Sequence, residues 1–236
     1  MVKVHVHVDF DGTIAPDDPT DALFDAFADP SWHEVETQWQ AGQLTSRECM
    51  QRQANLLRCT PEEMNAFLDQ RRIDPHFVEF VKLCEGYGAD VTILSDGFEQ
   101  VVGRLLAKAG LSLPYFANRL KYEGKGQWSC QFPHTTGACR SRMGNCKCSH
   151  QLKCTETVKV AVGDGRSDFC MAEHSHFVLC KGQLIKHCQT EGLVHRPFEN
   201  FADATTTMSI WFRGWNRTKL DQIGGSRDDT RFPGNY

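Results

Sequence analysis

Two kinds of feature are scarce in this sequence, and their scarcity limits what the protein does. No apolar run approaches the roughly 20 residues that a membrane-spanning helix requires. Basic residues form no stripe along the chain. The 26 Lys and Arg are outnumbered by 30 Asp and Glu, so the net charge is −4. We therefore expect neither a membrane nor a nucleic acid as a partner. No internal repeat is visible, which argues against a repeat architecture.

The start of the chain also lacks the pattern of a secretion signal, because its apolar residues alternate with polar ones and lead into an acidic motif. We therefore expect a cytoplasmic protein. In that compartment the 11 cysteines favour reduced thiols or metal ligands over a framework of disulfides.

The first strand pattern ends in two acids. Val4, Val6 and Val8 alternate with polar positions, and valine is a strong strand former. Asp9 and Asp11 follow directly. Two carboxylates at the end of a buried strand are costly without a partner, and a divalent cation is a suitable one. In open α/β sheets the functional crevice lies at such strand ends.

Strands that alternate with helices predict an α/β fold with a parallel sheet. Further strand patterns cover residues 89–94, 158–162 and 176–179, and residues 14–72 have helical patterns with capping residues at the helix starts. A length of 236 residues with 40% hydrophobic content suits a core domain with an insert.

The domain organisation follows from these patterns. We expect a core of residues 1–14 and 74–213, with residues 15–73 inserted as a small helical domain. The last helix pattern covers residues 202–212. Residues 214–236 have little apolar content, which predicts a poorly ordered or surface-wrapped tail.

Two other strand patterns end in polar residues. Ser95 to Gly97 stand between a strand and a helix, where free backbone N–H groups at a helix start bind phosphate; an ordinary strand-to-helix turn is the alternative. Asp164 and Asp168 follow the strand at 158–162. Since parallel strands end at the same edge, these groups and the first two acids are expected to lie together.

Three segments resemble, in order and spacing, motifs one, two and four of the haloacid-dehalogenase (HAD) phosphatases: DFDGT at 9–13, ILSDG at 93–97 and VAVGDGRSD at 160–168. The resemblance spans about residues 4–205. It implies a Rossmann-like core, a helical cap of the C1 type inserted after the first motif, and Mg²⁺-dependent phosphoryl transfer through an aspartyl-phosphate.

The resemblance also implies roles for the acids. Asp9 would be the nucleophile and a metal ligand. Asp11 would be the general acid and base, with its backbone carbonyl on the metal. Asp164 would be the third protein ligand. Asp168 would be either a further ligand or a support for the ligands, and support is favoured. Oxygen ligands of this kind suit Mg²⁺.

Phosphate binding is expected from Ser95 and from the N–H groups near Asp96 and Gly97. The family's third motif supplies a lysine that holds the phosphate. The candidates before the fourth motif are Lys121, Lys125, Lys147, Lys153 and Lys159. Lys147 is favoured, because it precedes the strand that runs to the crevice, whereas Lys159 lies within that strand.

Around Lys147 the resemblance narrows to the hydroxyketo-methylthiopentenyl-phosphate phosphatases of methionine salvage, which are close to the phosphoserine phosphatases. The similar segments are Phe132-Pro133-His134, Cys139, Cys146-Lys147, the stretch from Gly42 to Met50, and His195-x-Pro197-Phe198. The substrate would be a small phosphorylated metabolite.

The expected helical insert offers Arg47 and Glu48 as substrate contacts, although both also suit a solvated helix start. The segment before motif four is rich in thiols and imidazoles: Cys130, Cys139, Cys146, Cys148, Cys154, His134 and His150. A structural zinc ion or a reduced loop that shapes the site are the two alternatives. His5 and His7 are expected to pack against helices rather than bind metal.

Three functions remain open on the sequence. The favoured one is a Mg²⁺-dependent phosphatase of small metabolites. The second is a phosphoserine phosphatase-like enzyme with the same core. The third is an inactive HAD domain that uses its cysteine loop as a binding module. A monomer and a homodimer are both compatible with the sequence.

Overall fold

The computed structural model describes residues 3–137, 142–155 and 157–223. A seven-stranded sheet lies at its centre, in the order β4-β3-β2-β1-β5-β6-β7. Neighbouring strands are parallel except β3 and β4, which form an antiparallel hairpin at one edge. The strands are β1 (Lys3–Val8), β2 (Asp90–Phe98), β3 (Tyr115–Gly124), β4 (Gln127–Gln131), β5 (Thr157–Gly163), β6 (Phe177–Cys180) and β7 (His195–Pro197). The predicted α/β fold with a mainly parallel sheet is confirmed.

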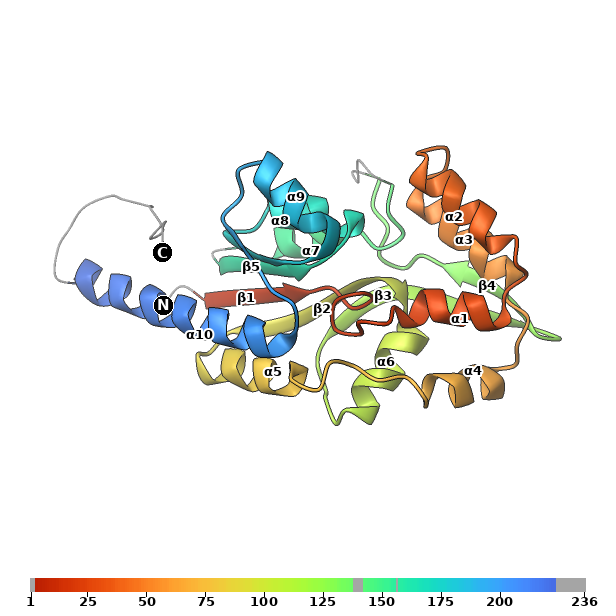
Figure 1. Ribbon diagram of the computed structural model, residues 1–236, viewed down its shortest axis with the longest axis horizontal. Helices are drawn as coiled ribbons and strands as arrows, with labels where there is room; N and C mark the ends of the chain where they lie inside the picture. Colours follow the sequence, from red (N-terminus) through yellow and green to blue (C-terminus); the bar gives the residue numbers. More distant parts are fainter. Residues whose placement is uncertain (1–2, 138–141, 156, 224–236) are drawn as a thin grey trace.

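Helices cover both faces of this sheet (Figure 1). One layer contains α5 (Phe77–Gly86), α6 (Glu99–Lys108) and α10 (Phe201–Ile223). The other contains α7 (Lys147–Lys153), the short 3₁₀ helix η1 (Arg166–Asp168), α8 (Phe169–Glu173) and α9 (Gly182–Thr190). The alternation in β1 divides its side chains between the layers, because Val4, Val6 and Val8 join the larger buried cluster while His7 contacts Cys154 beside α7.

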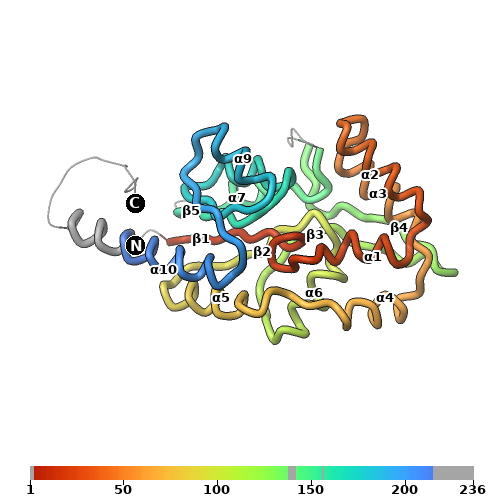
Figure 2. Tube along the Cα trace, in the orientation of Figure 1, coloured from red at the N-terminus to blue at the C-terminus, as the bar shows by residue number. Residues whose placement is uncertain are grey.

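Four helices stand between β1 and α5 in the chain: α1 (Pro19–Phe27), α2 (Trp32–Gln40), α3 (Ser46–Leu56) and α4 (Pro61–Leu68). The helical character predicted for residues 14–72 is therefore confirmed. Thr45 and Thr60 start α3 and α4 with complete capping boxes. In Figures 1 and 2 these helices gather beyond the carboxyl ends of the central strands, near the β3–β4 hairpin. They therefore lie over the edge where the acidic motifs end.

The structure corrects two expected boundaries. β2 continues through Ser95 to Phe98, and its pairing with β3 shifts between Leu94 and Phe98, so α6 starts only at Glu99. The last helix runs beyond the predicted end at Phe212 to Ile223. The beginning of the segment 214–236 is thus helical, and residues 224–236 lie outside the described part of the chain. Among the described residues, no helix is both long enough and apolar enough to cross a membrane.

Candidate active site

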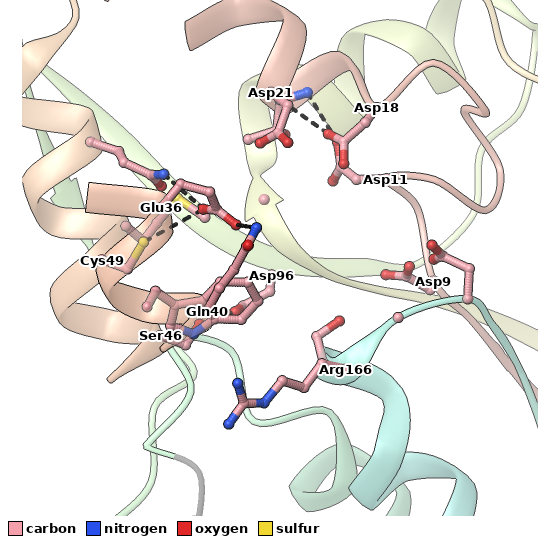
Figure 3. Close-up of a pocket in the computed structure, with 18 of the residues that line it drawn as sticks. Asp9, Asp11, Asp18, Asp21, Glu36, Gln40, Ser46, Cys49, Asp96 and Arg166 are labelled. Carbon is pink, nitrogen blue, oxygen red and sulfur yellow. Dashed lines mark hydrogen bonds between the residues drawn. The ribbon is translucent and has the colours of Figure 1, made fainter. Parts of the chain in front are cut away.

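A cavity of about 500 Å³ lies between the carboxyl ends of the central strands and the helical insert (Figure 3). Its sheet side carries Asp9 and Asp11 of motif one and Asp164 of motif four. Its other side comes from α1, α2 and α3. The lining residues are Asp9, Asp11, Asp18, Thr20, Asp21, Glu36, Trp39, Gln40, Ser46, Cys49, Met50, Gln53, Asp96, Gly97, Asp164, Gly165, Arg166, Ser167 and Gln183.

Asp9 stands directly after β1, where its backbone N–H donates to the carbonyl of Val162 at 2.9 Å and so continues the parallel ladder. Its side chain is buried, with 4% of its surface exposed. Lys147 Nζ lies 2.5 Å from Asp9 Oδ1, and the Thr13 hydroxyl donates to Oδ2 at 3.3 Å. This carboxylate is therefore held in place by groups from two different segments.

Lys147 is the first residue of α7, and its ammonium group is almost fully buried. Besides Asp9, it donates to Asp168 Oδ1 at 2.6 Å and to Ser167 Oγ at 3.0 Å. Burial alone would lower the pKa of Lys147, but the carboxylates of Asp168 and Asp9 raise it above its usual value. The predicted position of Lys147 within hydrogen-bond reach of Asp9 agrees with these distances; its catalytic role stays a prediction.

Asn145 holds the loop that delivers Lys147, a function that the sequence reading missed. Its side-chain amide donates to the carbonyls of Ser95 and Phe116 at 2.8 and 2.7 Å. Its backbone N–H donates to Asp96 Oδ1 at 3.0 Å. The motif-three loop is thus tied to the end of β2. The only signal in the sequence was an amide residue two positions before the favoured lysine.

Asp11 points toward a different set of partners from Asp9. Ser95 Oγ donates to its Oδ2 at 3.0 Å, and the N–H of Thr20 donates to its Oδ1 at 3.2 Å. Burial, followed by the charge of Asp18, raises the pKa of Asp11 to about 7. A carboxyl with that pKa exchanges a proton readily near neutral pH, which suits the acid and base role predicted for it.

The predicted phosphate-binding turn, Ser95 to Gly97, already forms hydrogen bonds within the protein. The N–H of Gly97 donates to Ser95 Oγ at 2.8 Å, so this N–H group already has a partner. A Cβ atom at Gly97 would lie 2.5 Å from Asp11 Oδ2 and 2.6 Å from Thr20 Oγ1. Glycine is therefore required here because the backbone passes directly against the Asp11 carboxylate.

The remaining acids of the sheet side form a group suited to a cation. Asp9, Asp164 and Asp168 each bring one carboxylate oxygen to within 4.8 Å of the others. Thr13 Oγ1 donates to Asp164 Oδ1 at 2.9 Å. Burial raises the pKa of Asp9 to about 7 and that of Asp168 to about 6, and it also raises the pKa of Asp164. Bringing a divalent cation to these oxygens would favour their charged forms.

Asp168 is fully buried, and its two oxygens accept three hydrogen bonds. Oδ1 accepts from Lys147, while Oδ2 accepts from the N–H groups of Asp164 and Gly165 at 3.0 and 3.2 Å. A Cβ atom at Gly163 would lie 2.4 Å from Asp168 Oδ2, so the chain packs closely around this side chain. Such contacts are compatible with a residue that positions the ligands, and this role of Asp168 stays a prediction.

Asp96 joins the sheet to the helical insert. Its Oδ2 accepts from Ser46 Oγ at 2.5 Å, and its Oδ1 accepts from the N–H of Asn145. The first residue of α3 is therefore bonded to the end of β2. The residues of α3 that line the cavity are Ser46, Cys49, Met50 and Gln53. The two predicted substrate contacts on this helix are not among them.

The structure places Arg47 and Glu48 outside the cavity lining. Glu48 accepts from the backbone N–H and hydroxyl of Thr45 at 2.9 and 2.8 Å in the capping box. The Arg47 guanidinium lies 6.0 Å from the ring centre of Phe132. These two side chains are thus occupied by the helix start and by the neighbouring loop, which is the alternative that the sequence allowed.

Instead, α1 and α2 present acids to the cavity (Figure 3). Asp18, Asp21 and Glu36 line it from the insert. Burial, with repulsion from the neighbouring carboxylate of Asp21, raises the pKa of Asp18 to about 7. Arg166 enters from the sheet side and lies 5.8 Å from the ring centre of Trp39. The sequence reading missed these acids, because nothing in their spacing along two helices predicts that they converge.

Within the part of the chain that the structure describes, no three potential ligands of the cysteine-rich segment lie together, and a zinc ion in this segment stays a prediction. Cys139 lies outside that part. Cys146 and Cys148 have their sulfurs 3.5 Å apart, but they do not join any group of three potential ligands there. Cys154 instead groups with His5 and His7.

Comparison with known proteins agrees with this site. The family model of haloacid dehalogenase-like hydrolases matches residues 6–173. A 2-hydroxy-3-keto-5-methylthiopentenyl-1-phosphate phosphatase of an Exiguobacterium species is 30% identical over 212 residues, covering 88% of this chain and 98% of that protein. The enzyme of the same name from Geobacillus kaustophilus is 31% identical over 202 residues, covering 83% and 90%.

Among solved structures, a phosphoserine phosphatase carrying an analogue of the phospho-aspartyl intermediate has the same fold, with a TM-score of 0.64 at 20% identity, over 85% of this chain and 95% of that one. The family match covers most of the chain and includes motifs one, two and four. Together with the placement of the acids at the strand ends, it assigns the chain to a family: this protein belongs to the haloacid dehalogenase-like hydrolases.

Proposed function

We propose that this protein is a Mg²⁺-dependent phosphomonoester hydrolase that acts through an aspartyl-phosphate on Asp9. The observation that carries the proposal is the separation of two buried carboxyl groups. Burial raises the pKa of both groups to about 7, but Asp9 is paired with the Lys147 ammonium at 2.5 Å, which favours its charged form, whereas Asp11 is bonded to the uncharged groups of Ser95 and Thr20. One group is thus suited to attack as an anion, and the other to carry a proton.

In the first half of the reaction, a carboxylate oxygen of Asp9 forms a bond to phosphorus while the bond to the ester oxygen breaks. Asp11, in its protonated form, gives its proton to that leaving oxygen. In the second half, ionised Asp11 takes a proton from a water molecule, whose oxygen attacks phosphorus and releases inorganic phosphate from Asp9. Lys147 keeps its charge throughout and holds the nucleophile in position.

The donors on the sheet side fit Mg²⁺, because they are carboxylate oxygens grouped within 4.8 Å and are costly to ionise without a cation. Asp9, Asp164 and the backbone carbonyl of Asp11 would hold the ion, with Asp168 as support. When bound, Mg²⁺ supplies charge neutralisation between the dianionic ester and the nucleophile. Residues 15–73 would act as the cap over a core of 1–14 and 74–213.

The substrate we favour is the phosphorylated intermediate of methionine salvage named in the relatives. Two of them are about 30% identical over more than four fifths of this chain. The insert side of the cavity also offers Trp39, Cys49 and Met50. These apolar or sulfur-containing side chains suit a methylthio group, because thioethers pack favourably against such surfaces.

A phosphoserine-type substrate is the second candidate, and a specific observation favours it. Asp18, Asp21 and Glu36 line the insert side, where they would attract an amino group. The Glu36 oxygens accept from the amides of Gln40 and Gln53 at 3.1 Å each, which orients the carboxylate without neutralising it. The interpretation as an inactive binding module has less support, because the side chains proposed for catalysis contact one another in pairs, Lys147 with Asp9 and Ser95 with Asp11.

Hydrolysis of p-nitrophenyl phosphate with Mg²⁺ and with a chelator tests the reaction class. We expect turnover that needs Mg²⁺ and disappears in Asp9→Asn. Turnover that is unaffected by the chelator would overturn the metal assignment, and none under any condition would favour the binding-module reading.

Values of kcat/KM for the methylthiopentenyl ester and for O-phosphoserine then separate the substrates. We expect a preference of at least about 100-fold for the methylthiopentenyl ester. If phosphoserine is preferred instead, Glu36→Gln should reduce that preference, whereas Glu34→Gln, on the exposed side of the same helix, should leave it unchanged.

A further inference from the structure

A second cluster of potential ligands lies on β1, away from the cavity lining. His5 and His7 project from the same face of the strand, because they are two residues apart. Their rings stack with centres 4.3 Å apart and planes 8° apart. Cys154, directly after α7, brings its sulfur to 3.9 Å from His7 Nε2. One ring nitrogen from each histidine and the sulfur all lie within 4.8 Å of one another.

Two features concern the hydrogen bonds of these histidines: one ring is held in place by a bond, and the other has a nitrogen without a partner among the described residues. The ring of His5 is oriented by a 2.9 Å hydrogen bond between its Nε2 and the hydroxyl of Thr92. His7 is 1% exposed, and its Nδ1 has no hydrogen-bond partner among the described residues. A buried polar atom without a partner costs about 1–3 kcal/mol. A ligand that bonds to a nitrogen of this ring would therefore stabilise the folded protein.

We propose that His5, His7 and Cys154 form a binding site for a thiophilic divalent ion of the zinc type, separate from the Mg²⁺ site at the strand ends. Imidazole nitrogen and thiolate sulfur are the usual ligands of zinc, whereas Mg²⁺ prefers oxygen. Three protein ligands leave one tetrahedral position for water. Thr92 would act on the ion only through His5, by holding its ring in place.

The position of the cluster indicates what the ion does. Cys154 follows the last residue of α7, while Lys147 at the first residue of the same helix reaches Asp9 and Asp168. An ion bound to His5, His7 and Cys154 would fasten the far end of α7 to β1. It is therefore a clamp that positions the helix carrying Lys147 and takes no part in the reaction.

Lys159 provides a built-in test of this assignment. It pairs with His5 across β1 and β5, so its charge lies beside the cluster on the same face of the sheet. A cation at the site would be repelled by this ammonium group. Replacing Lys159 by glutamine should therefore strengthen metal binding, whereas an effect of general packing would not have that sign.

The experiment titrates the metal-free protein, purified without a histidine tag, with Co²⁺ and then with Zn²⁺. We expect one thiolate-bound Co²⁺ per chain, seen as a thiolate-to-cobalt absorption band that Zn²⁺ removes, and a higher melting temperature with Zn²⁺. Cys154→Ser should abolish the band, and His5→Gln should weaken binding at least about 10-fold. Cys148→Ser, on the same helix but outside the cluster, should retain the band, and Lys159→Gln should bind more tightly.

Circular dichroism confirms that each variant is folded, and His5→Gln keeps the test decisive if Cys154→Ser is unstable. A wild-type protein without the absorption band would overturn the proposal. So would a band that survives Cys154→Ser, or one that is lost only in Cys148→Ser, which would place the metal in the cysteine loop. Because binding and melting are measured without substrate, these outcomes do not depend on whether the protein is a phosphatase.

Discussion

The carboxylates on the two sides of the cavity differ in their partners. On the sheet side, Asp9 and Asp168 share the buried ammonium of Lys147, and Asp164 is bonded to Thr13. On the insert side, Asp18 and Asp21 have each other as close neighbours and no ion pair among the described residues. The sheet side is thus organised before any ligand arrives, whereas the insert side leaves its charge for a ligand to meet.

This difference matches the division of labour in a phosphatase. Groups that act on the phosphate must be held within a fraction of an ångström, which the hydrogen bonds around Asp9 and Lys147 provide. Groups that select the leaving group must differ between enzymes with the same chemistry. Damage to the sheet side should therefore lower turnover, and changes on the insert side should alter pH dependence or substrate choice.

The largest effect is expected for Asp9→Asn, which removes the nucleophile while keeping its shape. We expect kcat to fall by roughly 10⁴ or more, as for other covalent nucleophiles. Steady-state hydrolysis of p-nitrophenyl phosphate measures it. Asp25→Asn, on the exposed side of α1, is the control and should retain activity. Substantial turnover by a folded Asp9→Asn protein would remove the basis of the proposed mechanism.

The next effect concerns Lys147→Ala. Turnover should fall by about 10², the usual loss for a preorganised charge contact. The melting temperature at pH 7 should also fall, because the variant leaves the Asp9 and Asp168 carboxylates without their cation. Both acids have raised pKa values, so they become protonated as the pH falls below about 6, and the difference from wild type should shrink there. Lys153→Ala, at the exposed end of α7, should show neither effect.

A smaller effect is expected for Gly97→Ala, because its Cβ would lie 2.5 Å from Asp11 Oδ2 and displace that carboxyl. We expect kcat to drop by about 10-fold, since a shift well under 1 Å is enough to impair proton transfer. The matched variant is Gly86→Ala, at the end of α5 and outside the cavity lining, where a Cβ would meet nothing within 4 Å. Equal turnover of the two variants in the phosphatase assay would contradict the close approach seen at Gly97.

The smallest effect is a shift of the pH profile in Asp18→Asn. The charge of Asp18 helps to raise the pKa of Asp11, so its removal should lower that pKa. Asp11 must be protonated to give a proton to the leaving oxygen. The alkaline limb of kcat/KM should therefore move to lower pH. Roughly half a pH unit is expected for a charge at this distance in a partly screened site. An unmoved alkaline limb, or an equal shift in the exposed variant Asp17→Asn, would show that this limb does not belong to Asp11.

Much of the fold could be predicted because it depends on local patterns. The alternation of valines around His5 and His7 predicted β1, and Thr45 and Thr60 predicted the starts of two helices. The long course of β2 could not be predicted, since its end depends on pairing with β3 rather than on its own residues. The end of the last helix at Ile223 was likewise missed, because a polar composition alone does not end a helix.

In the site, the sequence by itself determined which residue types stand at the strand ends. A strand of period two followed by Asp9 and Asp11 places both acids at the edge of a parallel sheet, whatever the rest of the chain does. The resemblance around Cys146 was also enough to favour Lys147 over four other lysines. These features are local in the chain, so they can be read without coordinates.

Only the tertiary structure decided which distant side chains meet. The anchoring of Lys147 by Asn145, the acids of α1 and α2 in one cavity, and the approach of Cys154 to His7 join segments far apart in sequence. Such contacts depend on how helices pack onto the sheet, and on which polar groups find partners once they are buried. Local periodicity contains no information on those distances, because the same strand and helix patterns are compatible with many packings.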